Sequence, residues 1–575
     1  MALNITSRGF KRTLLYSCLL LVLAGCGGGG EGGDVQALSA PAYRYDTDMV
    51  QIASGTVGAD QESTAAMRVF KDIPYAAPPL GVLRWKPPQP VSSWTGTRKA
   101  TGFAPGCMQN QNTNFTSLLY SGSAPTVSEN CLYLNIWTSA ATEGERRPVM
   151  VFLHGGGNAT GATAVPTYGG AGLASKGVVV VTMGYRLGVL GWLSHSELSA
   201  ESPDKVSGNY GLLDQIAALR WVKVNIAGFG GDPDNVTLFG QSAGAEDVHS
   251  LMTSPLARGL FHRALLGSGP QFPGARGDVR TLAQAEMQGA TFAAAAKAPD
   301  LAALRAMSAT DLQALSNTYA AGPTIDGHVL PDQTDRAFRS HQAADVPVMV
   351  GYMADEQIAF RQASAPVGSM GPGFAETFAA FQATSQGAFG VLAEQVRSFY
   401  GVADDASAAA VRYSIVHDFQ FGWQVYTLAR TMNATTSSKA YVYYFNRVPP
   451  YYDYQRNYLE AADPTTAGSY HTLEQVYLYN NLDRRPRPYA DVDRRLADIG
   501  STYLVNFATS GDPNRPVTMT AAGNVLPQWP AFAAGDGRLM LLGDVIAPAA
   551  PVNRAAMELF DRVWAQKLGR PLAFK

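Results

Sequence analysis

The sequence predicts an α/β fold built on a large, mostly parallel sheet. Residues 149–153, 178–182 and 346–351 are short, nearly continuous runs of apolar and β-branched side chains. Such runs are typical of strands buried on both faces, as the strands of a parallel sheet are. Residues 212–224 have the pattern of an amphipathic helix, and strands that alternate with helices indicate an α/β protein.

The remaining elements follow in chain order. Residues 51–57 and 67–70 alternate as strands do, which is consistent with a leading hairpin. The prolines that follow, up to residue 88, exclude helix and predict an extended path over the surface. Further predictions are strands at 132–137, 236–239 and 440–445, helical insertions within 275–320 and 370–435, and a closing helix at 555–568.

Composition narrows the class of protein. The 575 residues are 46% hydrophobic and carry a formal net charge of −2, which is ample for a large core. Because the chain is near neutral and has no long basic run, we expect no nucleic-acid partner. No histidine–carboxylate cluster has metal-ligand spacing, so we expect no metal and no organic cofactor. Without a repeat or an internal linker, residues 45–575 are predicted to form one domain.

The N-terminal residues resemble the export signal of a lipoprotein. Basic residues precede a short apolar segment, 14–24, which is too short to span a bilayer. The sequence LAGC, ending at Cys26, resembles the lipobox of bacterial lipoproteins, in which cleavage precedes a cysteine that then carries lipid. We therefore expect a signal peptide at 1–25, a lipidated Cys26 with a glycine-rich tether over 26–44, and an exported protein anchored in the cell envelope. The alternative is ordinary secretion, with Cys26 as an incidental thiol.

The cysteine count then predicts a disulfide. Cys18 leaves with the signal and Cys26 is the anchor, so Cys107 and Cys131 remain, 24 residues apart, in an oxidising compartment. A bond between them is worth about 3 kcal/mol in the chain-entropy model. The alternative is two buried free thiols.

Residues 240–244 form a G-x-S-x-G pentapeptide. They follow the predicted strand 236–239 and precede a segment compatible with a helix. A serine on such a tight turn has a strained backbone, and its hydroxyl is lifted clear of the sheet. The pentapeptide alone is weak in a chain with 58 glycines, but its setting makes Ser242 a candidate nucleophile. A serine hydroxyl also needs a general base and donors for the oxyanion.

Donors for an oxyanion are predicted after the strand 149–153, where the sequence reads HGGG. The backbone N–H groups of Gly156 and Gly157, with that of Ala243, would make a three-donor oxyanion hole. A plain glycine-rich turn or a phosphate loop is the alternative, although no Gly-Lys-Ser/Thr follows.

The general base and the acid that orients it are expected C-terminal to Ser242. His471, in a glycine-led loop after a late strand, is preferred to His417, which stands beside Asp418 in a helical region. Asp355 and Glu356 both follow the strand 346–351, and either could orient the imidazole. The order serine, acid, histidine is the order found in α/β hydrolases.

From about residue 45 to 565 the chain resembles the type-B carboxylesterase family, which includes the cholinesterases and many bacterial esterases. The motifs that carry the resemblance are FKDIPYAAPPLGVLRWKPPQP, SENCLYLNIW, HGGG, SGNYGLLDQIAALRWVKVNI, FGGDPDNVTLFGQSAG and GPTIDGHVLPD. It implies an α/β-hydrolase fold, with helical insertions forming the pocket, and hydrolysis of carboxylic esters through an acyl-enzyme.

The resemblance also implies a role for each site residue. It places the nucleophile on Ser242, the acid on Glu356 rather than Asp355, and the base on His471, with Glu474 as the family's nearby glutamate. Its oxyanion donors fall on Gly156, Gly157 and Ala243, and its first disulfide falls on Cys107 and Cys131.

Some residues depart from the family pattern. Gln357 and Thr472 stand where the family usually has glycine, so those two loops are expected to differ in shape. Cholinesterases have a glutamate where this chain has Gln241, and a tryptophan inside the first disulfide loop, where this chain has none. We therefore expect a neutral ester, short- to medium-chain or aromatic. The alternatives are lipase, amidase or acyl-transfer activity on the same triad, and a non-catalytic binding scaffold.

Overall fold

The computed structural model describes residues 48–100, 102–110, 126–273, 279–356, 377–450 and 468–569, with Leu572 and Phe574. Cys26 and Gln357 lie outside the described residues. All of the described residues belong to one compact unit.

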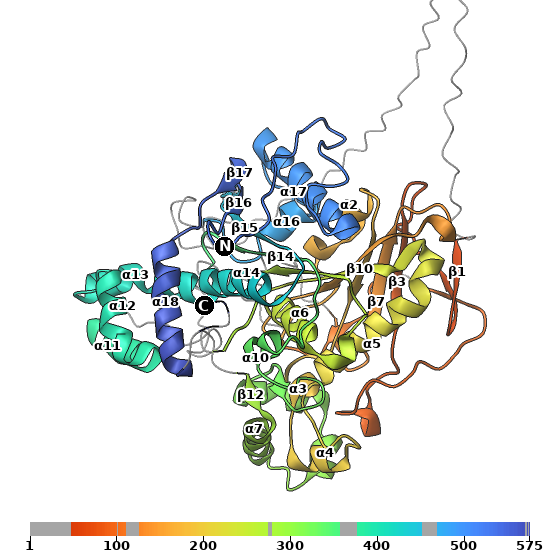
Figure 1. The fold of residues 1–575 in the computed structure, drawn as a ribbon. Helices are drawn as coiled ribbons and strands as arrows, with labels where there is room; N and C mark the ends of the chain where they lie inside the picture. Colours follow the sequence, from red (N-terminus) through yellow and green to blue (C-terminus); the bar gives the residue numbers. More distant parts are fainter. Residues whose placement is uncertain are drawn as a thin grey trace, which may run out of the picture. The chain divides into compact units, whose positions relative to one another are not determined.

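The described residues are organised by a ten-stranded sheet with the order β17-β16-β15-β14-β11-β10-β8-β9-β7-β3 (Figure 1). Its strands are β3 (Arg68–Pro74), β7 (Tyr133–Thr138), β8 (Arg147–Leu153), β9 (Val179–Met183), β10 (Gly231–Gln241), β11 (Arg263–Gly267), β14 (Val348–Met353), β15 (Ala440–Phe445), β16 (Leu539–Leu542) and β17 (Ile546–Ala549). All pairs from β9 across to β16 are parallel, and antiparallel pairs close both ends. The predicted mostly parallel sheet is therefore confirmed.

Helices cover both faces of the sheet, which explains the continuous apolar runs. Along β8, Val149, Val151 and Leu153 face one core, while Met150 and Phe152 face another. The first core is closed by α5 (Tyr210–Asn225), α6 (Ala243–Thr253) and α14 (Trp423–Thr435), and the second by α2 (Ala171–Ala174), α16 (Glu474–Leu478) and α17 (Asp491–Ser510). In Figure 1, α2, α16 and α17 lie above the strands, and α5 and α6 lie below them.

The two predicted helical insertions are present. The first contains α7 (Leu282–Ala295), α8 (Leu301–Ala306) and α9 (Ala309–Ala314); the second contains α11 (Phe378–Phe389), α12 (Ala393–Phe399), α13 (Asp405–His417), a π-helix (Asp418–Gly422) and α14. Capping boxes start two of them, because Thr281 and Asp404 each accept the N–H three residues ahead. The chain also forms α3 (Gly188–Trp192), α4 (Ser196–Glu201), α10 (Thr334–Arg339) and the closing helix α18 (Arg554–Leu568).

The leading strands pair differently from the prediction. Residues 51–57 are not one strand: β1 (Met49–Ile52) and β2 (Gly55–Gly58) form an antiparallel hairpin around a two-residue turn. β3 pairs with β7 instead. The alternation of the side chains continues across so short a turn, so the pattern could not reveal it.

The proline-rich segment follows the surface but buries one tryptophan. β3, the edge strand of the sheet, runs to Pro74, and Gly81–Leu83 form a 3-10 turn. Trp85 is buried, and its indole N–H donates to Val189 O at 3.0 Å. Leu80 and Val82 are 45% and 78% exposed, so the segment follows the surface as predicted and turns Trp85 into the core.

Within the part of the chain that the structure describes, no helix combines the length and the hydropathy needed to cross a membrane.

Candidate active site

Ser242 lies on a tight turn between β10 and α6. Its backbone angles are φ 55° and ψ −127°, a strained conformation for a residue with a side chain. Its N–H donates to Gly267 O at 2.8 Å, which fixes the turn to the neighbouring strand β11. A Cβ at Gly244 would lie 2.1 Å from Leu153 O, so only glycine lets α6 start this close to the end of β8. The turn has the geometry that the G-x-S-x-G motif predicts.

The HGGG segment begins where β8 ends, beside this turn. Gly156 and Gly157 have φ of 114° and 63°, and the N–H groups of Ala159 and Thr160 both donate to Gly156 O. Ala243 is the first residue of α6, and the first N–H groups of a helix have no partner within it. A Cβ built on Gly155 would lie 3.0 Å from the Ser242 Cβ, so the HGGG segment and the start of α6 both lie beside Ser242.

Buried aromatic and imidazole rings support this loop. His154 stacks on Tyr185 with ring centroids 4.5 Å apart, and the Tyr185 hydroxyl donates to His154 O at 2.7 Å. Burial lowers the pKa of His154 to about 4, so this ring is neutral at pH 7. His154 therefore supports the loop.

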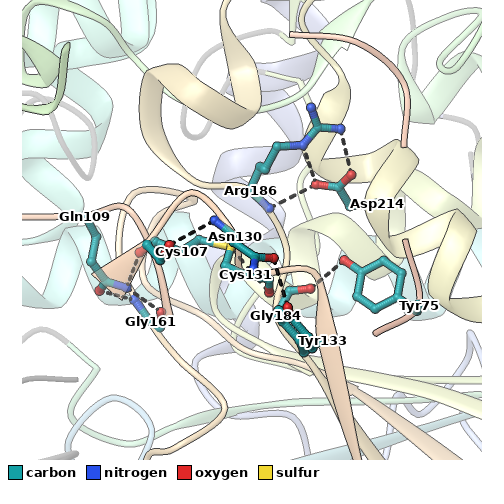
Figure 2. The surroundings of a disulfide bond; sticks show 11 residues. Tyr75, Cys107, Gln109, Asn130, Cys131, Tyr133, Gly161, Gly184, Arg186 and Asp214 are labelled. Atoms are coloured by element: carbon teal, nitrogen blue, oxygen red, sulfur yellow. Dashed lines mark hydrogen bonds and ion pairs between the residues drawn. A yellow bond between two sulfur atoms is a disulfide. The ribbon is translucent and has the colours of Figure 1, made fainter. Parts of the chain in front are cut away.

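The disulfide lies beside the same loop. Cys107 and Cys131 are bonded, as the cysteine count predicts, with Cα atoms 5.0 Å apart. Gln109 lies two residues after Cys107 and makes two hydrogen bonds to Gly161. Its Nε2 donates to Gly161 O at 2.7 Å, and its Oε1 accepts the Gly161 N–H at 2.9 Å (Figure 2). The disulfide-bonded segment is thus fixed to Gly161, four residues after the end of the HGGG sequence.

His471 and Glu356 form a buried pair. His471 Nδ1 donates to Glu356 Oε2 at 2.5 Å, and Glu356 Oε1 accepts the Met353 N–H at 2.8 Å. Glu356 is fully buried and His471 is 3% exposed. The other ring nitrogen, Nε2, lies 3.3 Å from Nε2 of Gln241, the residue before Ser242. The structure therefore brings the three predicted residues to one place.

Asp355, the neighbouring carboxylate, has a different role. Its Oδ2 accepts the Ser469 N–H at 2.7 Å, and its own N–H donates to Ser469 O at 3.0 Å. Asp355 thus ties the end of β14 to the loop that carries His471. Of the two carboxylates that the residues alone left open, Glu356 contacts the imidazole.

His417, the alternative base, contacts the backbone that holds the acid. Its Nδ1 lies 3.0 Å from Asp418 Oδ1 and its Nε2 lies 3.0 Å from Met353 O. Burial would lower the pKa of His417, but the hydrogen bond and the charge of Asp418, with the charge of Glu356, raise it above its usual value. The His417 ring therefore supports Met353, whose N–H donates to Glu356. No sequence pattern indicated this role.

Thr472, directly after His471, has a left-handed backbone conformation. Thr472 has φ 76°, where a β-branched residue is a strained outlier. Thr472 is also buried. The expected difference in shape between this loop and that of the family stays a prediction.

Two further buried groups lie near the site: Phe421, which the sequence did not indicate, and Glu474, which the family resemblance indicated. Phe421, on the π-helix, lies with its ring centroid 5.5 Å from that of His471. Burial, with the charge of the nearby Glu356, raises the pKa of Glu474 well above its usual value. In the described ranges, no three His, Cys, Asp or Glu side chains are grouped to hold a metal ion.

Comparisons with known proteins agree with this geometry. A sequence profile of the carboxylesterase family matches residues 46–554. The chain is 39% identical over 530 residues to the fumonisin B1 esterase of Sphingopyxis macrogoltabida, covering 89% of each chain. It is 31% identical to the para-nitrobenzyl esterase of Bacillus subtilis, covering 85% of this chain and 94% of that protein. A solved structure of PNB esterase matches with a TM-score of 0.73 at 27% identity, covering 89% of this chain and 99% of that one.

Proposed function

The chain belongs to the carboxylesterase family and is a serine ester hydrolase with an α/β-hydrolase fold, and on this premise we propose that Ser242, His471 and Glu356 are its catalytic triad. One observation carries the proposal. His471 is bonded to the buried Glu356 at 2.5 Å through Nδ1, while its Nε2 lies beside Gln241, the neighbour of Ser242.

In the first step, the Ser242 hydroxyl attacks the ester carbonyl, and His471 Nε2 takes the proton. Glu356 keeps the other ring proton on Nδ1 and stabilises the imidazolium that forms. The tetrahedral intermediate collapses when the bond to the alcohol oxygen breaks. His471 returns its proton to that oxygen, so a neutral alcohol leaves and the acyl group stays on Ser242.

In the second step, water repeats the same sequence. His471 takes a proton from water, the hydroxide adds to the acyl carbon, and the bond to Ser242 Oγ breaks as the proton returns to it. In both steps the N–H groups of Gly156, Gly157 and Ala243 are the proposed donors to the oxyanion, where one such donor is worth about 10²–10³ in rate.

We further propose that the substrate is a neutral ester, short- to medium-chain or aromatic. The residue before the nucleophile, Gln241, is uncharged, so no carboxylate at this position attracts a cationic alcohol. Two relatives are named as esterases of para-nitrobenzyl compounds and of fumonisin B1. Both are therefore compounds to test.

The test measures hydrolysis of p-nitrophenyl esters from acetate to palmitate, of a para-nitrobenzyl ester and of fumonisin B1, with Ser242→Ala as the matched control. We expect the highest kcat/KM among the shorter acyl chains, and loss of all turnover in the variant. Turnover that persists in a folded Ser242→Ala protein would refute the assignment of the nucleophile. A maximum at palmitate would favour a lipase.

For the location of the enzyme, we propose export and lipid anchoring through Cys26. The LAGC sequence and the glycine-rich residues behind it support this proposal. Multiple acyl chains on one residue are enough for stable membrane attachment. We expect labelled fatty acid to be incorporated into the wild type and not into Cys26→Ser. A wild-type protein without label, recovered in the soluble fraction, would contradict it.

A further inference from the structure

The HGGG loop continues with an unusual run of backbone conformations. Gly156, Gly157 and Asn158 have successive φ of 114°, 63° and 56°. Asn158 is the member of this run that carries a side chain, and asparagine is among the residues that tolerate positive φ best. Its O accepts the Gly188 N–H at 2.7 Å, so the loop is also fixed to the start of α3.

The Asn158 side chain reaches the helix that follows the nucleophile. Its Nδ2 donates to Asp247 Oδ1 at 3.2 Å, and the other carboxylate oxygen accepts Gln215 Nε2 from α5 at 2.6 Å. Asp247 lies five residues after Ser242 on α6 and is fully buried, and Asn158 is 2% exposed. This hydrogen bond joins the loop that carries Gly156 and Gly157 to the helix that begins with Ala243.

We propose that Asp247 and Asn158 are a positioning pair that holds the two halves of the oxyanion hole at their working separation. The proposal rests on the triad and the oxyanion donors proposed above. The donors come from separate elements, and each must lie 2.7–3.1 Å from the oxyanion. A misplacement of about 1 Å costs about 10²-fold in rate, so a direct link between the elements has a large effect on catalysis.

The chemistry of the pair argues against a purely structural role. Burial raises the pKa of Asp247 to about 7, although the hydrogen bonds from Gln215 and Asn158 oppose the shift. Tyr185, the other titratable group that faces Asp247, is a phenol that stays neutral and brings no positive charge. A buried carboxylate without a cation destabilises a fold. Buried groups that destabilise the fold in this way are expected at functional sites.

The test exchanges the donor and the acceptor. Asn158→Asp alone sets two carboxyl groups against each other, and we expect kcat to fall by about 10- to 100-fold with KM changed less than about threefold. In the double variant Asn158→Asp/Asp247→Asn, the new amide at position 247 donates to the carboxylate at 158 and still accepts from Gln215. Because aspartate also tolerates positive φ, we expect kcat to return to within about fivefold of wild type.

A second measurement separates positioning from loss of stability. A trifluoromethyl ketone forms a tetrahedral oxyanion adduct on the nucleophile, so its Ki should rise in Asn158→Asp in proportion to the fall in kcat/KM. The control is Asp561→Asn on α18, which removes a buried carboxylate that holds Arg430 and Trp423. We expect this control to melt earlier while keeping kcat and Ki.

A folded Asn158→Asp variant with wild-type kcat and Ki would overturn the proposal, as would a double variant no more active than the single one. If Asn158→Asp does not fold, the double variant decides alone: it must fold and keep kcat within about tenfold, the loss expected from partial misplacement of a donor. If Ser242→Ala is inactive and Asn158→Asp keeps wild-type kcat and Ki, only the positioning pair is rejected. If Ser242→Ala is active, the proposed catalytic triad is rejected.

Discussion

Replacing Glu356 by glutamine keeps the size of the side chain and removes one of the two acceptors that the site uses. In the wild type, Oε2 accepts from His471 Nδ1 at 2.5 Å and Oε1 accepts from the Met353 N–H at 2.8 Å. A glutamine has a single oxygen, so one of these two donors must face an NH₂ group. If the oxygen stays with Met353, the NH₂ faces Nδ1 and the imidazole must carry its proton on Nε2. In that tautomer it cannot accept the Ser242 proton.

The opposite orientation of the amide is costly. It would set the NH₂ group against the Met353 N–H in a fully buried place, and an unsatisfied buried donor costs about 1–3 kcal/mol. The variant therefore prefers the inactive tautomer. In the serine-protease triad, the corresponding change lowers kcat about 10⁴-fold. We expect a fall of about 10³- to 10⁴-fold here, which is about 4–5 kcal/mol in the barrier.

The assay is steady-state hydrolysis of p-nitrophenyl acetate, with Asp355→Asn as the matched control. Asp355 is the adjacent carboxylate, but it accepts from the Ser469 N–H and not from the imidazole. We expect Asp355→Asn to retain kcat within about tenfold, since it only loosens a loop. The reasoning would be refuted if Glu356→Gln stayed within tenfold of wild type, or if Asp355→Asn lost as much activity as Glu356→Gln.

Three further predictions concern stability. Because burial raises the folded-state pKa of Asp247 from 3.8 to about 7, wild-type stability should fall as the pH rises through this window. Asp247→Asn lacks this titration, so urea unfolding should show its stability relative to wild type rising by about 3 kcal/mol between pH 4 and 7; a constant difference would contradict it. Cys107→Ser/Cys131→Ser should lose about 3 kcal/mol, measured the same way, and an equal midpoint would remove the disulfide from the account. Gly244→Ala should be inactive and melt early, because its Cβ would lie 2.1 Å from Leu153 O; full activity would show that the turn is looser than described.

Periodicity identified the strands whose two faces are both covered. β8, β9 and β14 are buried along most of their length, so their sequences contain little but apolar residues. β16 was missed because four residues, LMLL, are too few to separate a strand from a buried loop. The hairpin of β1 and β2 was missed because pairing partners are not encoded in alternation.

Some residues of the site could be predicted from local sequence motifs, and others could not. Ser242 and the HGGG loop are local motifs, and their geometry follows from neighbours in the sequence. Glu356 and His471 are 115 residues apart, so the residues alone could not choose between Glu356 and Asp355, and the family resemblance was needed. The Asn158–Asp247 bond, 89 residues apart, has no sequence pattern, since a single aspartate in a helix is usually a surface residue.

The central claim is that catalysis passes through a covalent acyl group on Ser242, and a covalent probe tests it most directly. An aryl phosphate triester, diethyl p-nitrophenyl phosphate, transfers its phosphoryl group to an activated serine and releases p-nitrophenolate. Mass spectrometry of a digest should show the adduct on the peptide that contains Ser242, with one equivalent of p-nitrophenolate released as activity is lost. Loss of activity with the adduct on another residue, or an equal adduct in Ser242→Ala, would contradict the account.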